Sequence, residues 1–600
     1  MVKHQPIGPH ESDRIRCPKS TEPERKLGIP EEPPLSTRVW ENSYPPGVRW
    51  DAPLPPPVPV ESLLDSAAEK WPERVALDFY DRTFTFRELR DLAACAAKGL
   101  QALGVGPGVH VGLHLPNTPH FIVAFFAVLM AGGRVVNFSP LAAPRELKYQ
   151  ITDAEVQVMV TLGLPMLYPQ IAALKGTAKF ETLVVCAIGD FLPEPIARVF
   201  GPAAERAAGA GREIDFAALI ANDGKFRSHP HGPLEDEIAT LQYTGGTTGE
   251  PKGAMLTHAN FCAVVNAYRH WIGADEEPEK TLAVLPLYHI FGLSFIMLLS
   301  VAHGSQAVLH IRFDPDRVLA DIGRKKITSF PAVPTMYTAL VNHPKINEVD
   351  FSSLKLCASG GAPLPLEVLQ RFRQLTGLTP REGYGLTETA PLGTLQVIDG
   401  AGRPGTVGLP APHTVIEVVD LETGMKVLPT GEKGEICFRG PQVMKGYWNK
   451  PEATEEAFRG GRFHTGDIGC MDADGFVTLV DRKKDMILSG GYNVFPRNIE
   501  EAIYEHPAVA EVTVIGIPDA YRGQSAKAFI VLKSGQPAFG IEELKTFLAD
   551  KLAKYEMPTE MEIRAALPKT PVGKLSKKEL VAEELAKRPA AGGAGARDVA

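Results

Sequence analysis

Cysteine is scarce in this sequence. Seven cysteines are scattered over 600 residues, and no two of them are spaced as C-x-x-C. An odd number of isolated cysteines argues against a disulfide framework or a cysteine-based zinc site, and it favours reduced thiols in a cytosolic compartment.

Long apolar runs are also missing. The longest, residues 121–131 and 291–302, are shorter than the roughly 18–20 residues that cross a bilayer, which excludes integral insertion. The first residues, MVKHQPIGPHESDRIR, contain no apolar segment typical of a signal peptide. We therefore expect a cytoplasmic protein, and peripheral contact with the inner face of the membrane stays open.

The sequence has no surplus of basic residues. Its formal net charge of −8 argues against a broad nucleic-acid surface, which needs clustered cations. The content of 44% hydrophobic and 22% charged residues is typical of a soluble globular protein, and no repeat of solenoid length is present. The oligomeric state is not determined by these features, so a monomer and a dimer both remain open.

The order of segments predicts several folding units. After a proline-rich start, strand-like and helical segments alternate, which predicts largely parallel sheets with helices on both faces. Short β segments separated by glycine turns follow, as in a small barrel, and then a unit that mixes both types. The predicted fold class is α/β, with two doubly wound layers and a smaller C-terminal domain. The predicted divisions are a Pro-rich extension, 1–58; a large domain, 59–482, with α/β subdomains 59–235 and 236–404 and a β-barrel 405–482; a mobile α+β domain, 483–587; and a disordered tail, 588–600.

A loop rich in glycine and threonine is the most informative stretch. Residues 243–253 are YTGGTTGEPKG, between two apolar strand-like segments. Glycines let backbone N–H groups approach a ligand, threonine hydroxyls add donors, and Lys252 adds a compact positive charge. This combination suits a polyphosphate, although it is not a Walker loop because G-x-x-x-x-G-K-[ST] is absent. The candidate phosphate-binding residues are Thr244, Gly245, Gly246, Thr247, Thr248, Gly249 and Lys252.

Two further motifs offer groups that a nucleotide needs. Glu388, in GYGLTET, is a candidate Mg²⁺ ligand, because a carboxylate beside a phosphate loop needs a cation between them. Upstream, the turn SGGAPL offers backbone at Gly361 and Ala362 on which a flat base could lie, with Tyr384 stacked on its face. Taken alone, these motifs are equally compatible with a strand-exit turn and a core tyrosine.

Two charged motifs follow. Asp467, in HTGD, could accept hydrogen bonds from two ribose hydroxyls, with Arg482 further along the chain. Lys574, in PKTPVGK, stands on a loop framed by proline and glycine that could reach another domain and balance negative charge on phosphorus. On spacing alone, a surface aspartate and solvated basic loops explain these residues as well.

Taken together, the motifs resemble those of the adenylate-forming superfamily, which includes acyl-CoA synthetases, aryl-CoA ligases, luciferases and peptide-synthetase adenylation domains. The resemblance covers roughly residues 60–585 and is closest to bacterial medium- or long-chain fatty-acid–CoA ligases. The motifs that occur in the family's order are YTGGTTGEPKGAMLTH, PLYHIFG, SGGAPL, GYGLTET, HTGD, DRKKDMILSGGYNVFP and PKTPVGK.

The resemblance implies a role for each motif. It implies that the Gly/Thr loop and Lys252 hold the β- and γ-phosphates, that Gly361, Ala362 and Tyr384 frame adenine, and that Asp467 and Arg482 bind ribose. Thr387 would contact the α-phosphate, Glu388 the Mg²⁺, and Lys574 both the substrate carboxylate and the α-phosphate. The other implied residues are His289, Phe291, Gly292 and Phe295 in the acyl pocket, Lys484 as the interdomain hinge, and Gly490 and Gly491 in the tunnel for CoA. A buried structural histidine is the alternative explanation of His289.

The predicted function is therefore AMP-forming acyl-CoA synthesis from a fatty, aliphatic acid, with ATP, Mg²⁺ and CoA. The acid would attack the α-phosphorus to give acyl-AMP and pyrophosphate, and the CoA thiol would then release AMP. The nearest alternatives are an acyl-AMP ligase that loads a carrier-protein pantetheine, an aryl-CoA ligase, and a dicarboxylate ligase if Arg312 reached the pocket. A non-catalytic nucleotide or acyl sensor is the alternative from another class, but it predicts the loss of one of the key charged groups, all of which are present.

Overall fold

The computed structural model describes residues 38–192, 194–200, 211–244, 250–272, 278–398 and 402–587. Most of the predicted N-terminal extension and the predicted tail after residue 587 lie outside these ranges. Among the described helices, none combines the length and the apolar character that crossing a bilayer requires.

The first of two large sheets has seven strands in the order β7-β6-β5-β3-β4-β8-β9. All neighbours are parallel except β8 and β9, which form an antiparallel pair. The strands are β3 (His110–His114), β4 (Arg134–Asn137), β5 (Val158–Leu162), β6 (Thr182–Cys186), β7 (Arg212–Asp215), β8 (Ile238–Thr244) and β9 (Lys252–Thr257).

The second sheet also has seven strands, in the order β14-β13-β12-β10-β11-β1-β2, and only β2 is antiparallel to its neighbour. Its strands are β1 (Val75–Phe79), β2 (Arg82–Thr85), β10 (Lys280–Ala283), β11 (Gln306–Leu309), β12 (Ser329–Ala332), β13 (Leu356–Ser359) and β14 (Arg381–Glu382). The two layers confirm the predicted α/β class, but the sheets do not divide at residue 235. Strands β1 and β2 cross into the second sheet, while β8 and β9 complete the first.

Helices cover these sheets and bury most of the apolar sequence. Helix α2 begins with a reciprocal capping box between Thr85 and Glu88, in which each side chain bonds the other's backbone N–H. Every residue of α3 is buried, and α1 contacts both α2 and α10. The helices of the large domain are α1 (Ser62–Lys70), α2 (Phe86–Ala102), α3 (Pro119–Met130), α4 (Pro144–Asp153), α5 (Tyr168–Ala172), α6 (Glu194–Ala197), α7 (Phe216–Ile220), α8 (His258–Ile272), α9 (Ile290–Gly292), α10 (Leu299–His303), α11 (Pro315–Lys325), α12 (Pro334–Val341), α13 (Leu366–Thr376) and α14 (Pro451–Ala457).

A third, smaller sheet completes the large domain. It is antiparallel, with four strands in the order β17 (Val415–Val419), β18 (Gly434–Arg439), β19 (Phe463–Met471) and β20 (Val477–Arg482), and β15 (Thr394–Leu395) pairs with β16 (Leu409–Pro410) beside it. Because β17 and β20 are its edges, the predicted barrel is an open sheet in this structure.

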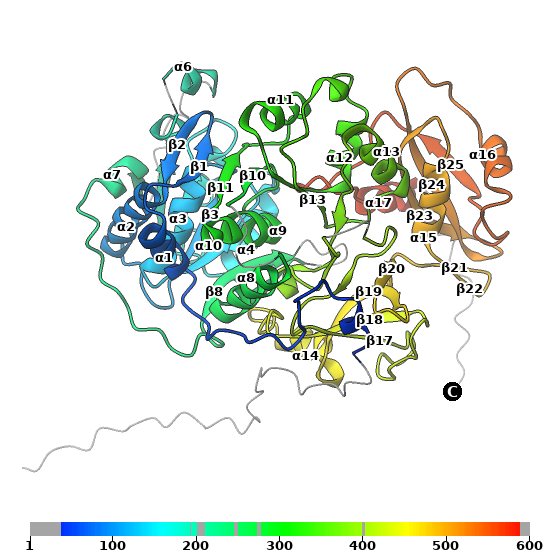
Figure 1. Ribbon diagram of the computed structural model, residues 1–600, viewed down its shortest axis with the longest axis horizontal. Coiled ribbons are helices and arrows are strands. Elements are labelled where there is room, and N and C mark those ends of the chain that lie inside the picture. The colour runs from blue at the N-terminus through cyan, green and yellow to red at the C-terminus, as the bar shows by residue number, and fades with distance from the viewer. Residues whose placement is uncertain are drawn as a thin grey trace, which may run out of the picture.

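The C-terminal domain has an apolar core of its own. Its sheet runs β22 (Tyr492–Val494), β21 (Ile487–Ser489), β24 (Gly523–Leu532), β23 (Val509–Asp519), with β25 (Glu560–Ile563) paired to β24, and its helices are α15 (Pro496–Tyr504), α16 (Ile541–Leu548) and α17 (Lys578–Lys587). Figure 1 shows this domain, in orange and red, beside α12 and α13 of the large domain. An ion pair of 3.3 Å between Lys533 and Glu367 of α13 links the two.

Candidate active site

A cavity of about 1370 Å³ lies where the second sheet, the small antiparallel sheet and the C-terminal domain meet. Its volume exceeds the ~300–1,000 Å³ of most small-molecule sites, so a nucleotide and a second substrate fit together. The predicted residues that line it are Thr244, Lys252, His289, Phe291, Phe295, Gly361, Ala362, Tyr384, Thr387, Glu388, Asp467, Arg482, Lys484 and Lys574. Residues from all seven motifs are thereby brought to one place.

The Gly/Thr loop connects the two antiparallel strands β8 and β9. Thr244 ends β8 and pairs with Lys252, which begins β9, so both ends of the loop open onto the cavity. The Lys252 ammonium lies 4.9 Å from the ring centroid of Tyr447, a cation–π contact that leaves its charge near the cavity. The predicted phosphate-binding residues Gly245, Gly246, Thr247, Thr248 and Gly249 lie outside the described residues.

Glu388 is a buried carboxylate held by one hydroxyl. The Tyr447 O–H donates to Glu388 Oε1 at 2.8 Å, and the Glu388 carbonyl accepts from the Met444 N–H at 2.7 Å. Burial raises the pKa of the Glu388 carboxyl, so a cation beside it would favour the ionised form. A carboxylate oxygen in a cavity open to phosphate ligands is the kind of donor that Mg²⁺ prefers, and Glu388 therefore fits that ion.

Asp467 and Arg482 are paired across neighbouring strands. Register places Asp467 of β19 opposite Arg482 of β20, and Arg482 Nε lies 3.2 Å from Asp467 Oδ1. The second oxygen, Oδ2, accepts from the Tyr384 O–H at 2.6 Å. Burial raises the pKa of Asp467, whereas the charge of Arg482 opposes that change. The carboxylate, the arginine and the tyrosine ring thus form one unit at the cavity wall.

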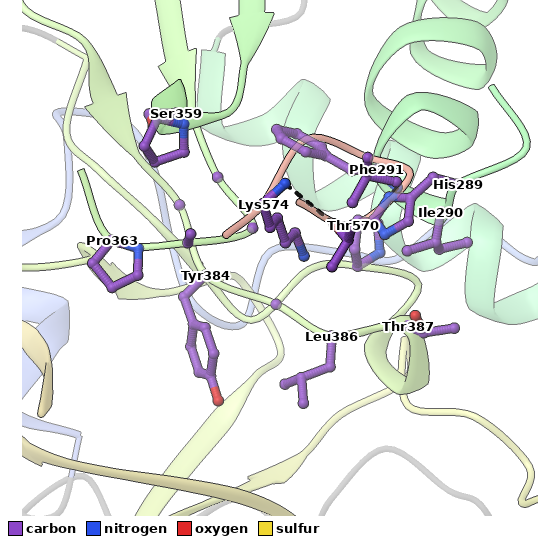
Figure 2. Close-up of a pocket in the computed structure, with 18 of the residues that line it drawn as sticks. His289, Ile290, Phe291, Ser359, Pro363, Tyr384, Leu386, Thr387, Thr570 and Lys574 are labelled. Carbon is purple, nitrogen blue, oxygen red and sulfur yellow. Dashed lines mark hydrogen bonds between the residues drawn. The ribbon is translucent and has the colours of Figure 1, made fainter. Parts of the chain in front are cut away.

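Lys574 comes from the C-terminal domain and is inserted beside the SGGAPL turn. Its loop is closed by a hydrogen bond of 2.7 Å from the Thr570 N–H to the Lys574 carbonyl and one of 3.1 Å from the Lys574 N–H to Thr570 Oγ1. Gly361 has a φ of 81°, and a Cβ added there would lie 2.6 Å from Lys574 Cε and 3.0 Å from Nζ. Figure 2 shows the lysine between Tyr384 on one side and the His289–Phe291 segment on the other.

The surroundings of Lys574 lower the pKa of its side chain. Loss of water around the ammonium, followed by the nearby charge of Arg482, lowers the pKa of Lys574 to about 8, and the Asp467 carboxylate opposes this shift. A half-buried cation at the cavity wall is suited to an anionic group bound there.

His289 and a row of aromatic rings form another wall. His289 Nδ1 accepts from the Phe291 N–H at 3.2 Å, and burial lowers the pKa of His289 to about 3, so the ring is neutral. The rings of Phe291 and Phe295 meet edge to face at 5.6 Å, and Phe295 meets Tyr268 at 5.4 Å. Phe295 lies in a π-helical turn, η5 (Leu293–Leu298), a rare geometry often found at functional sites.

Of the predicted site residues that the structure describes, three do not line the cavity. Gly292 is buried against the backbone, where an added Cβ would lie 2.2 Å from the Pro286 carbonyl oxygen. Gly490 and Gly491 form the turn between β21 and β22 with positive φ and no atom within 4 Å of an added Cβ. Lys484, by contrast, does line the cavity, and it lies between β20 and β21, where the chain passes from one domain to the other.

Some lining residues were not predicted. Tyr447 holds Glu388, although 59 positions separate them in the sequence. The Thr335 O–H donates to the Gly573 carbonyl at 2.6 Å and so holds the Lys574 loop against α12. The ring row continues to His303, stacked on Tyr268 at 6.5 Å. No local pattern marks these residues, because their partners come from distant parts of the chain.

Family profiles match both parts of the chain. The profile described as AMP-binding enzyme matches residues 64–448, and that of the AMP-binding enzyme C-terminal domain matches residues 498–574. The chain belongs to the AMP-binding enzymes. Its family membership agrees with the two-domain organisation that surrounds the cavity.

Relatives of this AMP-binding enzyme match it over nearly their whole length. It is similar to a long-chain-fatty-acid–CoA ligase of Bacillus subtilis (strain 168), with 41% identity over 92% of this chain and 98% of the relative. A long-chain-fatty-acid–CoA ligase of Escherichia coli O6:H1 is 36% identical over 90% and 98%. Among solved structures, an anthranilate CoA ligase in complex with anthranoyl-AMP has a TM-score of 0.80 at 28% identity, covering 89% of this chain and 98% of that one.

Proposed function

We propose that this protein is an ATP-dependent acyl-CoA synthetase that activates a fatty, aliphatic carboxylic acid. The acid becomes acyl-AMP with release of pyrophosphate, and the acyl group then passes to CoA with release of AMP. The observation that carries the proposal is the insertion of Lys574 between the SGGAPL turn and the Asp467–Arg482 pair, in one cavity with Glu388. The names of the relatives support a fatty acid as the substrate.

The cavity wall suggests how ATP would be held. The loop between Thr244 and Lys252 would take the β- and γ-phosphates, and Thr387 the α-phosphate. Adenine would lie between the Gly361–Ala362 backbone and the Tyr384 ring. Asp467 and Arg482 would bind the ribose hydroxyls, because a carboxylate is suited to accept from two vicinal hydroxyls.

Mg²⁺ would be held by Glu388, and when bound it would offset phosphate charge. The Glu388 carboxylate is already oriented by Tyr447, so the Glu388 side chain needs no rearrangement to bind the ion.

The first half-reaction would depend on positioning and charge. The substrate carboxylate is ionised at neutral pH, since such acids have a pKa of about 4–5, and no general base is needed. Lys574 would bring the carboxylate to the α-phosphorus and offset the charge that develops there. His289 is neutral and its Nδ1 is used by the Phe291 N–H, so it would shape the entrance of the acyl pocket and transfer no proton.

The second half-reaction would need a different arrangement of the domains. Gly490 and Gly491 lie away from the cavity here, and a rotation of the C-terminal domain about Lys484 would exchange the Lys574 loop for this turn. The turn has room for a ligand close to its backbone, which suits the pantetheine arm of CoA.

The acyl pocket favours an aliphatic monoacid. Phe291, Phe295 and Tyr268 provide an apolar wall, whereas Arg312, which a dicarboxylate would need, does not line the cavity. A panel of C4–C18 monoacids, dicarboxylates and aryl acids, assayed by AMP release with CoA and no carrier protein, would test this specificity. No disulfide joins the six cysteines in the described part of the chain, which supports a cytoplasmic location, and contact with the membrane surface remains a prediction.

Replacing Lys574 by alanine tests the proposed function. We expect the rate of acid-dependent ATP–pyrophosphate exchange to fall at least about 10²–10³-fold in K574A, because removing one positioned charge or donor from such a site has an effect of this size. Formation of acyl-CoA from supplied acyl-AMP should stay near the wild-type rate.

K569A is the matched control, since Lys569 stands on the same loop but pairs with Glu511 at 2.6 Å. It should retain both half-reactions. Near-normal exchange in K574A would refute the assignment of this lysine.

A further inference from the structure

A group of histidines and glutamates lies outside the candidate active site. None of these residues lines the cavity described above. They come from the start of α1, from the connection between α7 and β8, and from the start of α8. The group consists of Glu61, His229, His231, Glu237 and His258.

Three of them offer ligand atoms to one point. Glu61, His229 and His231 each contribute an atom, and these atoms lie within 4.8 Å of one another. The Glu61 Oε1 to His231 Nε2 distance is 3.0 Å. The residue is only 7% exposed, and its other oxygen, Glu61 Oε2, is buried without a hydrogen-bond partner. Two imidazoles and a carboxylate are a ligand set that Zn²⁺ accepts.

The second ring nitrogen of each imidazole lies beside another group, which is Glu237 for His231 and the turn after α3 for His229. His231 Nδ1 lies 3.2 Å from Glu237 Oε1, whose partner oxygen Oε2 accepts from the Gly232 N–H at 3.0 Å. A Cβ added at Gly132 would lie 3.1 Å from His229 Nδ1, so this nitrogen faces the turn after α3.

This arrangement leaves His229 Nε2 directed into the group, 3.9 Å from Glu237 Oε1, too far for a hydrogen bond. The hydrogen bond between His231 Nδ1 and Glu237 orients the His231 ring and its other nitrogen, as an outer oxygen does for a metal-binding histidine. Together with the unpartnered oxygen Glu61 Oε2, this distinguishes the group from residues that merely form ion pairs.

His258 is excluded as a ligand by its own hydrogen bond. The Val60 N–H donates to His258 Nδ1 at 3.0 Å, which uses the lone pair of that nitrogen. A neutral imidazole has one lone pair in the ring plane, so Nε2 then carries the proton. His258 thus lies beside the three ligand residues without contributing to them.

We propose that Glu61, His229 and His231 bind one divalent transition-metal ion such as Zn²⁺, with Glu237 orienting His231. The ion would join the start of α1 to the connection that leads into β8. Solvent reaches the site, because the His231 side chain is 19% exposed, so an ion can enter the folded protein. Nitrogen ligands distinguish this site from a Mg²⁺ site, which prefers oxygen.

A titration of tag-free, chelator-treated protein with Co²⁺ or Zn²⁺, without nucleotide, tests the proposal. We expect one ion per chain by calorimetry and a Zn²⁺-dependent rise of the melting temperature. X-ray absorption of the wild-type zinc complex should show two imidazole ligands, a result that needs no variant to fold.

Variants separate ligands from neighbours. H229Q, H231Q and E61Q should each weaken Zn²⁺ at least about tenfold, as loss of a ligand or its partner does. H258Q and the matched control H343Q, outside the group, should keep the wild-type affinity. The absence of stoichiometric Zn²⁺ binding to the wild type would overturn the proposal. An equal loss of Zn²⁺ affinity in H343Q, or a wild-type X-ray absorption spectrum without imidazole ligands, would overturn it too. If any of these results is found, His231 is instead a cation between the Glu61 and Glu237 carboxylates. Acyl-CoA formation is a separate measurement, so the two proposals fail independently.

Discussion

At the scale of single residues, the charged groups around the cavity already have defined partners. Asp467 contacts Tyr384 and Arg482, and Glu388 contacts Tyr447, at distances of 2.6, 3.2 and 2.8 Å. Burial raises the pKa of both carboxyls, so positive charge in the cavity favours their ionised forms. Because these charged groups are already positioned, binding a ligand costs little reorganisation free energy.

The pKa of Lys574 gives a prediction about pH. Burial lowers it to about 8, so the side chain is a cation below that pH and becomes neutral above it. We expect kcat/KM for ATP in the adenylation half-reaction to fall as pH rises through about 8, because this ratio reports groups of the free enzyme.

The thioester half-reaction from supplied acyl-AMP is the control for this profile. A thiol ionises with a pKa near 8.5, so this rate should rise over the same range. An adenylation profile that stays flat from pH 7 to 10 would contradict the charge role of Lys574.

At the scale of elements, local signals were sufficient where the partners are close in sequence. The capping box of Thr85 and Glu88 is a local signal for the start of α2, and the prolines at positions 119 and 144 are the residues with which α3 and α4 begin. Sheet membership was not predictable in this way. Strand β1 pairs with β11, where Leu77 is opposite Ala307, and nothing within either segment specifies so distant a partner.

The same reason limits the prediction of the site. Motifs identified Tyr384, Glu388, Asp467 and Lys574, which the fold does bring to one cavity. Tyr447 has no motif around it, because its role depends on Glu388 from another segment.

Helix α3 provides a test of core packing. Phe126 is fully buried and meets Phe125 edge to face at 5.6 Å, so F126A would leave a cavity inside the large domain. We expect a loss of about 3–5 kcal/mol in the free energy of unfolding of that domain, measured by urea denaturation. M166A, at a residue that is 70% exposed, should change it by less than about 0.5 kcal/mol. A loss below about 1 kcal/mol in F126A would contradict the packing described for α3.

At the scale of the whole molecule, two domains with separate cores meet across one cavity. The contacts between them include the Lys533–Glu367 ion pair and the Thr335–Gly573 hydrogen bond. Polar contacts of this kind can break when one domain rotates relative to the other, without loss of either apolar core.

Thr335 tests whether this docking matters for the first half-reaction. T335A removes the 2.6 Å hydrogen bond to Gly573, worth about 1 kcal/mol, so adenylation should slow about fivefold. Thioester formation from supplied acyl-AMP should not slow. T335S keeps the hydroxyl and should restore adenylation; equal slowing of both half-reactions in T335A would indicate general damage instead.

The glycine at position 361 sets how closely the two domains approach. The space that a methyl group would take there is filled by the Lys574 side chain, 2.6 Å away at Cε. Any larger residue would press on the Lys574 side chain in this arrangement of the domains, whereas Val333 Cγ1, at 3.7 Å from the added Cβ, would be in ordinary contact with it. If the C-terminal domain rotates as proposed, the smallest residue in the protein is the stop against which that domain closes.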